Sequence, residues 1–153
     1  MTTSRIMKVQ PIRNGTVIDH IKAGKGVKIM DILGFNNEGT AILSIMNVKS
    51  KKLNKKDIIK IEDRELSKED IARIALLSPK CNVNLIRNYS VYKKIQAKVS
   101  KINIDIARCP NQNCITNNQR DVKSKMILTN EEEFILTCAY CKRKSIGSNL
   151  KFI

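Results

Sequence analysis

The chain has 153 residues, of which 42% are hydrophobic and 28% are charged, a balance that excludes intrinsic disorder as its main state. No apolar run approaches the roughly 20 residues that a membrane-spanning helix needs, and the first residues lack the apolar core of a signal peptide. We therefore expect a cytoplasmic protein without a membrane partner, built of one domain or of two small ones.

Lysine and arginine outnumber the acidic residues by 29 to 14, which gives a formal net charge of +15. Such an excess favours an anionic partner, for example a nucleic acid, a nucleotide or an acidic protein face. The excess is concentrated in residues 1–100, which hold 20 basic and 9 acidic side chains. A lysine-rich surface is also typical of proteins from hot environments, so the charge alone leaves both explanations open.

The first hundred residues predict an extended arm over residues 1–15 and then a series of strands and helices. Gly34 is expected to end the first helix. Ser67 and Asp70 form a capping pattern for the second helix, which Pro79 brings to an end. Runs of β-branched residues between turn residues predict the strands. In chain order the predicted elements are a strand at 15–21, a helix at 26–33, strands at 40–46 and 57–62, a helix from Ser67 to Leu77, and strands at 82–87 and 90–97.

This order, with one strand added at the end, predicts a ferredoxin-like α+β fold in which two helices cover one face of an antiparallel sheet. The basic and polar run 49–56 is expected to be a loop within it. Near residues 98–103 the helical periodicity ends, so we place a domain boundary there. The two predicted domains are residues 1–100 and a small, all-β, zinc-ribbon-like domain over residues 101–153. A domain that small buries little core and commonly needs a metal ion.

Four of the five cysteines form two close pairs, Cys109-x4-Cys114 and Cys138-x2-Cys141. Two such turns can close a tetrahedron of thiolates around one ion, and sulfur ligands favour zinc or iron. Two disulfides are the alternative, which an intracellular location disfavours. We predict one structural Zn²⁺ per chain, because four protein ligands leave no open position for water or substrate. The fifth cysteine, Cys81, is expected to be a small buried residue.

Polar residues interrupt the apolar strands of the first domain. Asp19 and His20 lie in the first predicted strand, and the later strands contain Lys60, Asn84 and Lys94. A solvated outer sheet face accounts for each of them singly. Together they offer ammonium groups that suit phosphates and side chains that suit a base or a ribose. No recognisable set of nucleophile, base and orienting group occurs, so the sequence does not indicate an enzyme.

Two further sets of residues form a recognisable pattern. In the first domain they are Asn14 to Ile21, Lys56 to Glu62, and Pro79, Val83-Asn84, Ile86 and Asn88-Tyr89. In the second domain they are Cys109-Pro-Asn-Gln-Asn-Cys-Ile115 and Cys138-Ala-Tyr-Cys141. In these residues the sequence resembles the regulatory chain of aspartate carbamoyltransferase. The resemblance extends over essentially the whole chain, with the motifs in the family's order and spacing.

The resemblance implies a non-catalytic, allosteric chain of pyrimidine biosynthesis that forms homodimers, which bridge trimers of the catalytic chain. It implies that the first domain binds nucleotide effectors such as CTP, UTP and ATP, and that the zinc domain contacts the catalytic chain. Lys60 and Lys94 would bind phosphates, Asp19 would contact the ribose, and Ile12, Ile86 and Tyr89 would position the base. Position by position, the implied nucleotide contacts are Val9, Ile12, Val17, Asp19, His20, Lys60, Asn84, Ile86, Tyr89, Val91 and Lys94, and the implied zinc ligands are Cys109, Cys114, Cys138 and Cys141.

A basic zinc-ribbon protein that binds nucleic acid is the alternative. Lys142, Arg143 and Lys144 follow the second cysteine pair, where they could meet either phosphates or a protein partner. The aromatic content is only 4% with no Trp, which disfavours single-strand binding by base stacking. We therefore expect no specific nucleic-acid partner.

Overall fold

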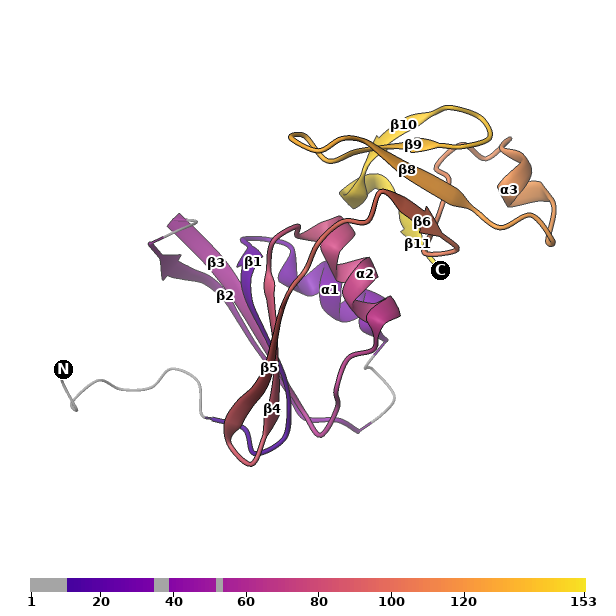
Figure 1. The fold of residues 1–153 in the computed structure, drawn as a ribbon. Coiled ribbons are helices and arrows are strands. Elements are labelled where there is room, and N and C mark those ends of the chain that lie inside the picture. Colours follow the sequence, from indigo (N-terminus) through magenta and orange to yellow (C-terminus); the bar gives the residue numbers. More distant parts are fainter. Residues whose placement is uncertain (1–10, 35–38, 52–53) are drawn as a thin grey trace.

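The computed structural model describes residues 11–34, 39–51 and 54–153, and it forms a larger N-terminal domain and a smaller C-terminal one (Figure 1). Within these ranges no helix combines the length and apolar character needed to cross a membrane. The elements of the N-terminal domain are β1 (Gly15–Lys22), α1 (Gly26–Leu33), β2 (Ile42–Ser50), β3 (Asn54–Glu62), α2 (Lys68–Leu77), β4 (Asn82–Arg87) and β5 (Ser90–Gln96). Those of the C-terminal domain are β6 (Ile102–Ile104), β7 (Ala107–Arg108), α3 (Ile115–Asn118), β8 (Lys125–Asn130), β9 (Ile135–Cys138), β10 (Lys144–Ile146), η2 (Gly147–Asn149) and β11 (Lys151–Phe152).

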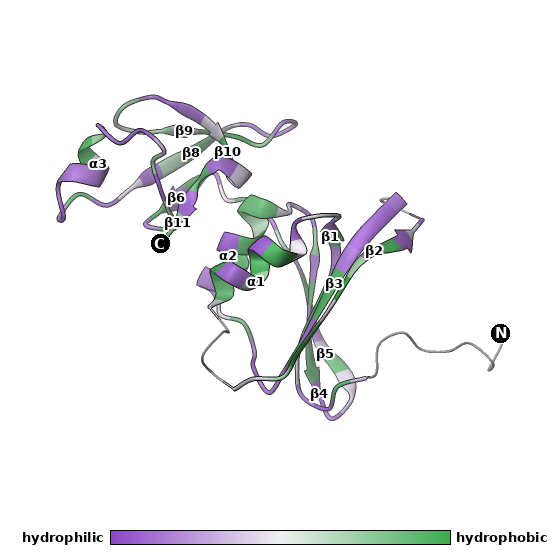
Figure 2. Cartoon of the chain, turned by 180° about the vertical axis from the view of Figure 1, so that it is seen from behind, coloured by the Kyte–Doolittle hydropathy of each residue, from purple (hydrophilic) through white to green (hydrophobic). Residues whose placement is uncertain are grey.

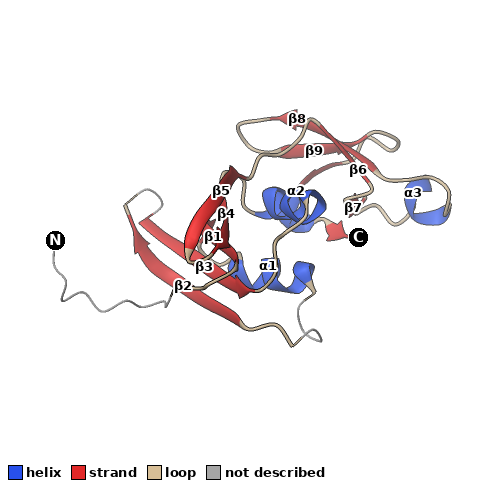
Figure 3. Cartoon of the chain, turned by 60° about the horizontal axis from the view of Figure 1, so that its bottom comes forward, coloured by secondary structure: helices blue, strands red, loops and turns tan. Residues whose placement is uncertain are grey.

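The N-terminal domain has the predicted ferredoxin-like fold. Its antiparallel strands follow the order β2-β3-β1-β4-β5, and α1 and α2 lie together on one face of the sheet (Figure 3). Each helix is a crossover between two parallel strands that are not adjacent, which places β1 in the centre. The added strand β5 returns from β4 through Asn88 and Tyr89. Their positive φ values of 50° and 65° match the tight turn that a two-residue hairpin favours.

The hydrophobic core of this domain lies between the sheet and its two helices. Ile18, Ile59 and Val83 of the three central strands are completely buried. Ile29 of α1 and Ile74 of α2 are equally buried and pack in the same cluster. Each such side chain stabilises the fold by about 1.5–3 kcal/mol when it leaves water. Because strand residues alternate between faces, the residues next to Ile18, Ile59 and Val83 along their strands point to the uncovered outer face.

The predicted helix ends are confirmed. Gly34 follows α1 with a left-handed φ of 68°, a conformation that glycine adopts without strain. At the start of α2 the Asp70 N–H donates to the Ser67 hydroxyl at 3.2 Å, and the Ser67 N–H donates to the Asp70 carboxylate at 3.1 Å. This reciprocal capping box satisfies backbone donors that the first turn would otherwise leave unpaired. The helix ends at Leu77, and its capping residue Ser78 directly precedes Pro79.

The prediction of a loop over residues 49–56 is wrong. β2 continues to Ser50 and β3 begins at Asn54, so most of this run forms the tip of a long hairpin. Lys49 lies opposite Lys55 there, because backbone pairing does not require apolar side chains. Both lysines are exposed, and the tip is coloured as hydrophilic in Figure 2. Residues 52–53, and most of the arm predicted over residues 1–15, lie outside the described residues.

The C-terminal domain is built mainly of short strands, as its sequence predicted. Four of them form an antiparallel sheet in the order β10-β9-β8-β6, and β7 pairs separately with β11. Met126 of β8 and Leu136 of β9 are buried on one side of this sheet, together with Cys138. The short helix α3, directly after Cys114, was not predicted. A domain with so small a core commonly needs a metal ion or another cross-link for stability.

Candidate metal centre and effector face

The structure brings all four predicted metal ligands together. The Sγ atoms of Cys109, Cys114, Cys138 and Cys141 all lie within 4.8 Å of one another. Cys109 Sγ is 3.5 Å from Cys141 Sγ, and Cys114 Sγ is 3.7 Å from Cys138 Sγ. A tetrahedral zinc ion with Zn–S bonds of about 2.3 Å separates its sulfur ligands by about 3.8 Å. The cluster therefore has the size that one four-coordinate metal ion requires.

Hydrogen bonds to backbone carbonyl oxygens hold the two cysteine loops in shape. The Asn117 side-chain amide donates to the carbonyl oxygens of Cys109 at 2.8 Å and of Asn111 at 2.7 Å, which ties the first loop to α3. In the second loop the Lys142 N–H donates to the Cys138 carbonyl at 3.0 Å and closes a tight turn. Sequence reasoning missed Asn117, because the spacing of the cysteines says nothing about which side chain supports them.

Burial raises the pKa of two of the four clustered cysteines, Cys109 and Cys138, and so favours their protonated thiols when no metal ion is bound. Burial raises the pKa of Cys109 to about 12, with a contribution from its hydrogen bond to Cys141, and burial also raises the pKa of Cys138. At Cys141 desolvation acts in the same direction, but a hydrogen bond with the Arg143 backbone and others outweigh it and lower the pKa to about 7. A metal ion must therefore displace protons to bind, which is usual for a structural thiolate site.

The lone cysteine, Cys81, is buried as predicted. Its side chain is completely shielded from solvent, and burial raises its pKa to about 12. A thiol in this state is a poor nucleophile, so Cys81 contributes to packing.

Four of the predicted nucleotide residues form a single row across the outer face of the N-terminal sheet. Lys60 of β3 lies opposite Val17 of β1, Val17 lies opposite Asn84 of β4, and Asn84 lies opposite Lys94 of β5. Neighbouring strands are about 4.8 Å apart, so the two lysines are separated by roughly 14 Å along the row. Two long side chains at that separation can reach one anion that lies over the central strands.

A bulge in β1 places Asp19 and His20 next to this row. The pairing of β1 with β3 shifts after Ile18, and His20 has a positive φ of 58°. Asp19 Oδ1 is 2.9 Å from Lys56 Nζ, and the Asn82 side-chain amide nitrogen is 3.0 Å from His20 Nδ1. The bulge thus re-aims two consecutive polar side chains toward partners on the neighbouring strands.

Lys56 and Asn82 are contacts that sequence reasoning missed. The alternation of strand residues could have identified them, because Lys56 precedes Lys60 by four positions and Asn82 precedes Asn84 by two. Each pair therefore shares a sheet face.

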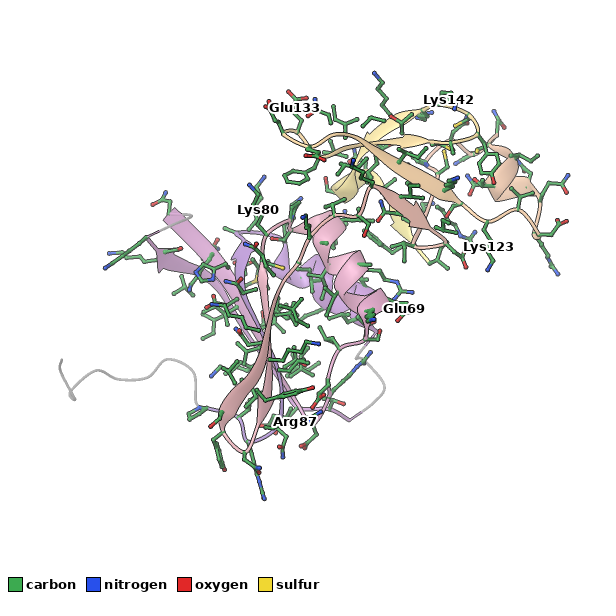
Figure 4. The ribbon with its side chains drawn as sticks, viewed as in Figure 1. Glu69, Lys80, Arg87, Lys123, Glu133 and Lys142 are labelled. Atoms are coloured by element: carbon green, nitrogen blue, oxygen red, sulfur yellow. The ribbon has the colours of Figure 1, made fainter. Side chains whose placement is uncertain are left out.

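The other predicted nucleotide residues lie farther along the same domain. Ile12 and Ile86 are both buried, with 7% exposure, and Ile12 lines a pocket of about 190 Å³ together with Lys60. Val91 lies opposite Ile86 and is exposed. Tyr89 is 65% exposed in the turn between β4 and β5, about 16 Å of strand length beyond the row. In Figure 4 the neighbouring Arg87 marks this end of the sheet, which is remote from the C-terminal domain. Val9 lies outside the described residues.

Partial burial lowers the pKa of Lys60 from its usual value. A bound phosphate would oppose this shift, because an adjacent negative charge favours the ammonium form. Lys60 is thus suited to gain from an anionic ligand on the outer face.

The opposite face of β3 carries a buried carboxylate that sequence reasoning also missed. Asp57 is completely buried, and its Oδ2 accepts hydrogen bonds from the N–H groups of Gly24 and Gly26 at 3.0 Å each. Its Oδ1 accepts from the Asn47 N–H at 2.9 Å. One side chain therefore fixes both the connection from β1 to α1 and the irregularity in β2. It lies directly beneath the outer sheet face that carries Lys60, Asn84 and Lys94, the candidate effector face.

Two family models match this chain. The model described as "Aspartate carbamoyltransferase regulatory chain, allosteric domain" matches residues 7–98, and the corresponding metal binding domain matches residues 101–149. The chain belongs to the family of aspartate carbamoyltransferase regulatory chains. Its relatives of that name include those of Pyrococcus abyssi and Pyrococcus horikoshii, which are 47% and 45% identical over 139 residues, 90% of this chain and 91% of theirs. The relative from Methanothrix thermoacetophila is 42% identical over 138 residues, 90% of each chain.

Membership in this family assigns a regulatory, non-catalytic role to the chain. The four clustered cysteines fall within the domain that matches as metal-binding. The row of polar residues on the outer sheet face falls within the domain that matches as allosteric.

Proposed function

We propose that this chain is the allosteric subunit of an aspartate carbamoyltransferase complex in pyrimidine biosynthesis, and that it binds nucleotide effectors such as CTP, UTP and ATP. The observation that supports this most strongly is the row that contains Lys60, Asn84 and Lys94, with Asp19 and His20 beside it. A nucleotide needs cations for its phosphates and hydrogen-bonding groups for its sugar and base, and this face offers both.

Each part of the nucleotide has a separate set of residues. Lys60 and Lys94 bind the phosphates from the two sides of the row, and the Asp19 carboxylate accepts a hydrogen bond from a ribose hydroxyl. The base lies toward the apolar end of the face, near Ile12, Ile86 and Tyr89.

In the C-terminal domain we propose one structural zinc ion held by the four cysteines. The ion cross-links the two cysteine loops of a domain that has only a small core. We further propose that this domain contacts the catalytic chain. Regulatory chains pair into homodimers, and these dimers bridge catalytic trimers. The closed set of four sulfur ligands supports a structural site, because it leaves no coordination position for a substrate.

Nucleotide calorimetry on lysine variants tests the effector site. Lys60→Ala and Lys94→Ala each remove a charged hydrogen bond worth roughly 1.5–3 kcal/mol, which corresponds to about ten- to hundredfold weaker binding of CTP. Lys93→Ala is the matched control, since Lys93 is the exposed neighbour of Lys94 and lies opposite the helix-facing Leu85. If both test variants bind CTP and ATP as the parent does, the effector site is placed wrongly.

A further inference from the structure

Gly147, the first residue of η2, lies so close to the end of α2 that no side chain fits between them. A Cβ atom built on Gly147 would be 1.7 Å from the Leu76 carbonyl oxygen and 2.6 Å from the Leu76 carbonyl carbon. Gly147 does not have a positive φ, so its backbone conformation is open to any residue. Glycine is required here for the close approach alone, and this approach joins the C-terminal domain to the N-terminal one.

Two hydrogen bonds hold the same C-terminal segment against the helices. Lys28 Nζ of α1 donates to the Ser148 carbonyl, and Arg73 Nε of α2 donates to the Ile153 carbonyl at 3.1 Å. Arg73 and Leu76 are three residues apart and therefore share one face of α2. Figure 1 shows this yellow segment beside the helices of the N-terminal domain. The contact involves both helices, and Gly147 is the point where the two backbones meet.

Short connections link this contact to both candidate sites. Two residues after Leu76, the Ser78 hydroxyl accepts a hydrogen bond at 2.9 Å from the Lys22 N–H, at the end of the strand that carries the Asp19–His20 bulge. On the other side β10 joins Gly147 to the loop of Cys141. The end of α2 and the short strand β10 therefore connect the candidate effector face with the metal centre.

We propose that Gly147 is a positioning residue for the allosteric response, because its contact with the Leu76 carbonyl sets the position of the metal domain relative to the effector face. The inference rests on the proposed function. A side chain at position 147 displaces η2 from α2 and carries β10 and the metal centre with it. Nucleotide binding then no longer alters how the metal domain meets the catalytic chain, while the nucleotide contacts are unchanged and the four cysteines keep their arrangement relative to one another.

The test uses the complex of this chain with its catalytic chain, prepared with the parent sequence, Gly147→Ala, Gly147→Val and the neighbouring control Ser148→Ala. Four quantities are measured: zinc per chain, size of the complex, CTP affinity by calorimetry, and half-saturating aspartate concentration with and without CTP, UTP or ATP. For Gly147→Val we expect the first three and the maximal rate to match the parent, and the nucleotide-induced shift in half-saturation to be lost. Gly147→Ala should show a reduced shift, and Ser148→Ala the full one.

The outcomes separate this inference from the proposed function. A Gly147→Val complex that keeps the parent's nucleotide-induced shift overturns the positioning role. Loss of zinc or of assembly in both Gly147 variants also overturns it, because the contact is then a requirement for folding. If the parent complex itself shows no shift with any of the three nucleotides, the proposed function fails first.

Discussion

Replacement of Asp57 by alanine is expected to destabilise the N-terminal domain strongly. The substitution leaves three backbone N–H groups without their acceptor, those of Gly24, Gly26 and Asn47. The Gly26 donor is buried, and its loss costs about 2 kcal/mol, while the two partly buried donors can recruit water and cost about 1 kcal/mol each. The total of about 4 kcal/mol is a large fraction of the 5–15 kcal/mol that stabilises a typical protein. The melting temperature of this domain should fall by roughly 16–32 °C, because 1 kcal/mol shifts a domain of 60–100 residues by about 4–8 °C.

Denaturant unfolding followed by far-ultraviolet circular dichroism measures this effect, with zinc present throughout. Asp57→Asn keeps one side-chain oxygen and should lose about half as much stability, because the Gly24 and Gly26 donors can share that oxygen. Asp31→Ala is the control, since Asp31 is exposed on α1 and its loss should change stability by no more than about 0.5 kcal/mol. An Asp57→Ala variant within 1 kcal/mol of the parent, an outcome below the range expected for even one buried donor, would refute the role assigned to these hydrogen bonds.

Two further predictions concern the metal centre and the net charge. Treating the complex with a mercurial, which modifies the four thiols, should release the catalytic chain with its carbamoyl-transfer activity intact, and Cys109→Ala should act likewise because three thiolates bind zinc more weakly. An assembly that survives full thiol modification contradicts the structural role of the cluster. Nucleic-acid binding should be weak and unselective at physiological salt, and log affinity should fall with log salt by about 0.9 for each neutralised phosphate contact. Tight, sequence-selective binding under those conditions would favour the basic zinc-ribbon alternative.

The features that the sequence predicted by itself depend on residues close together along the chain. The capping box of Ser67 and Asp70, the left-handed Gly34 and the turn at Asn88 and Tyr89 each involve only a few consecutive residues. The cysteine pairs belong to the same class, because each pair sits on one short loop. Alternating apolar residues also predicted the order of strands and helices, and from that order the ferredoxin-like fold followed.

The features that only the tertiary structure decided join segments far apart in the sequence. Strand register aligns Lys60, Asn84 and Lys94 in one row, and register is set by the packing of the whole sheet rather than by any local pattern. The lysine-rich run 49–56 became a hairpin because backbone pairing with a neighbouring strand outweighs the polarity of its side chains. In the sequence Asp57 is one more polar residue of a predicted strand. Only the folded chain brings the three backbone N–H groups within hydrogen-bond distance of its carboxylate. The sequence does not indicate that position 147 requires glycine, because the atom that excludes a side chain there is the Leu76 carbonyl oxygen of the other domain.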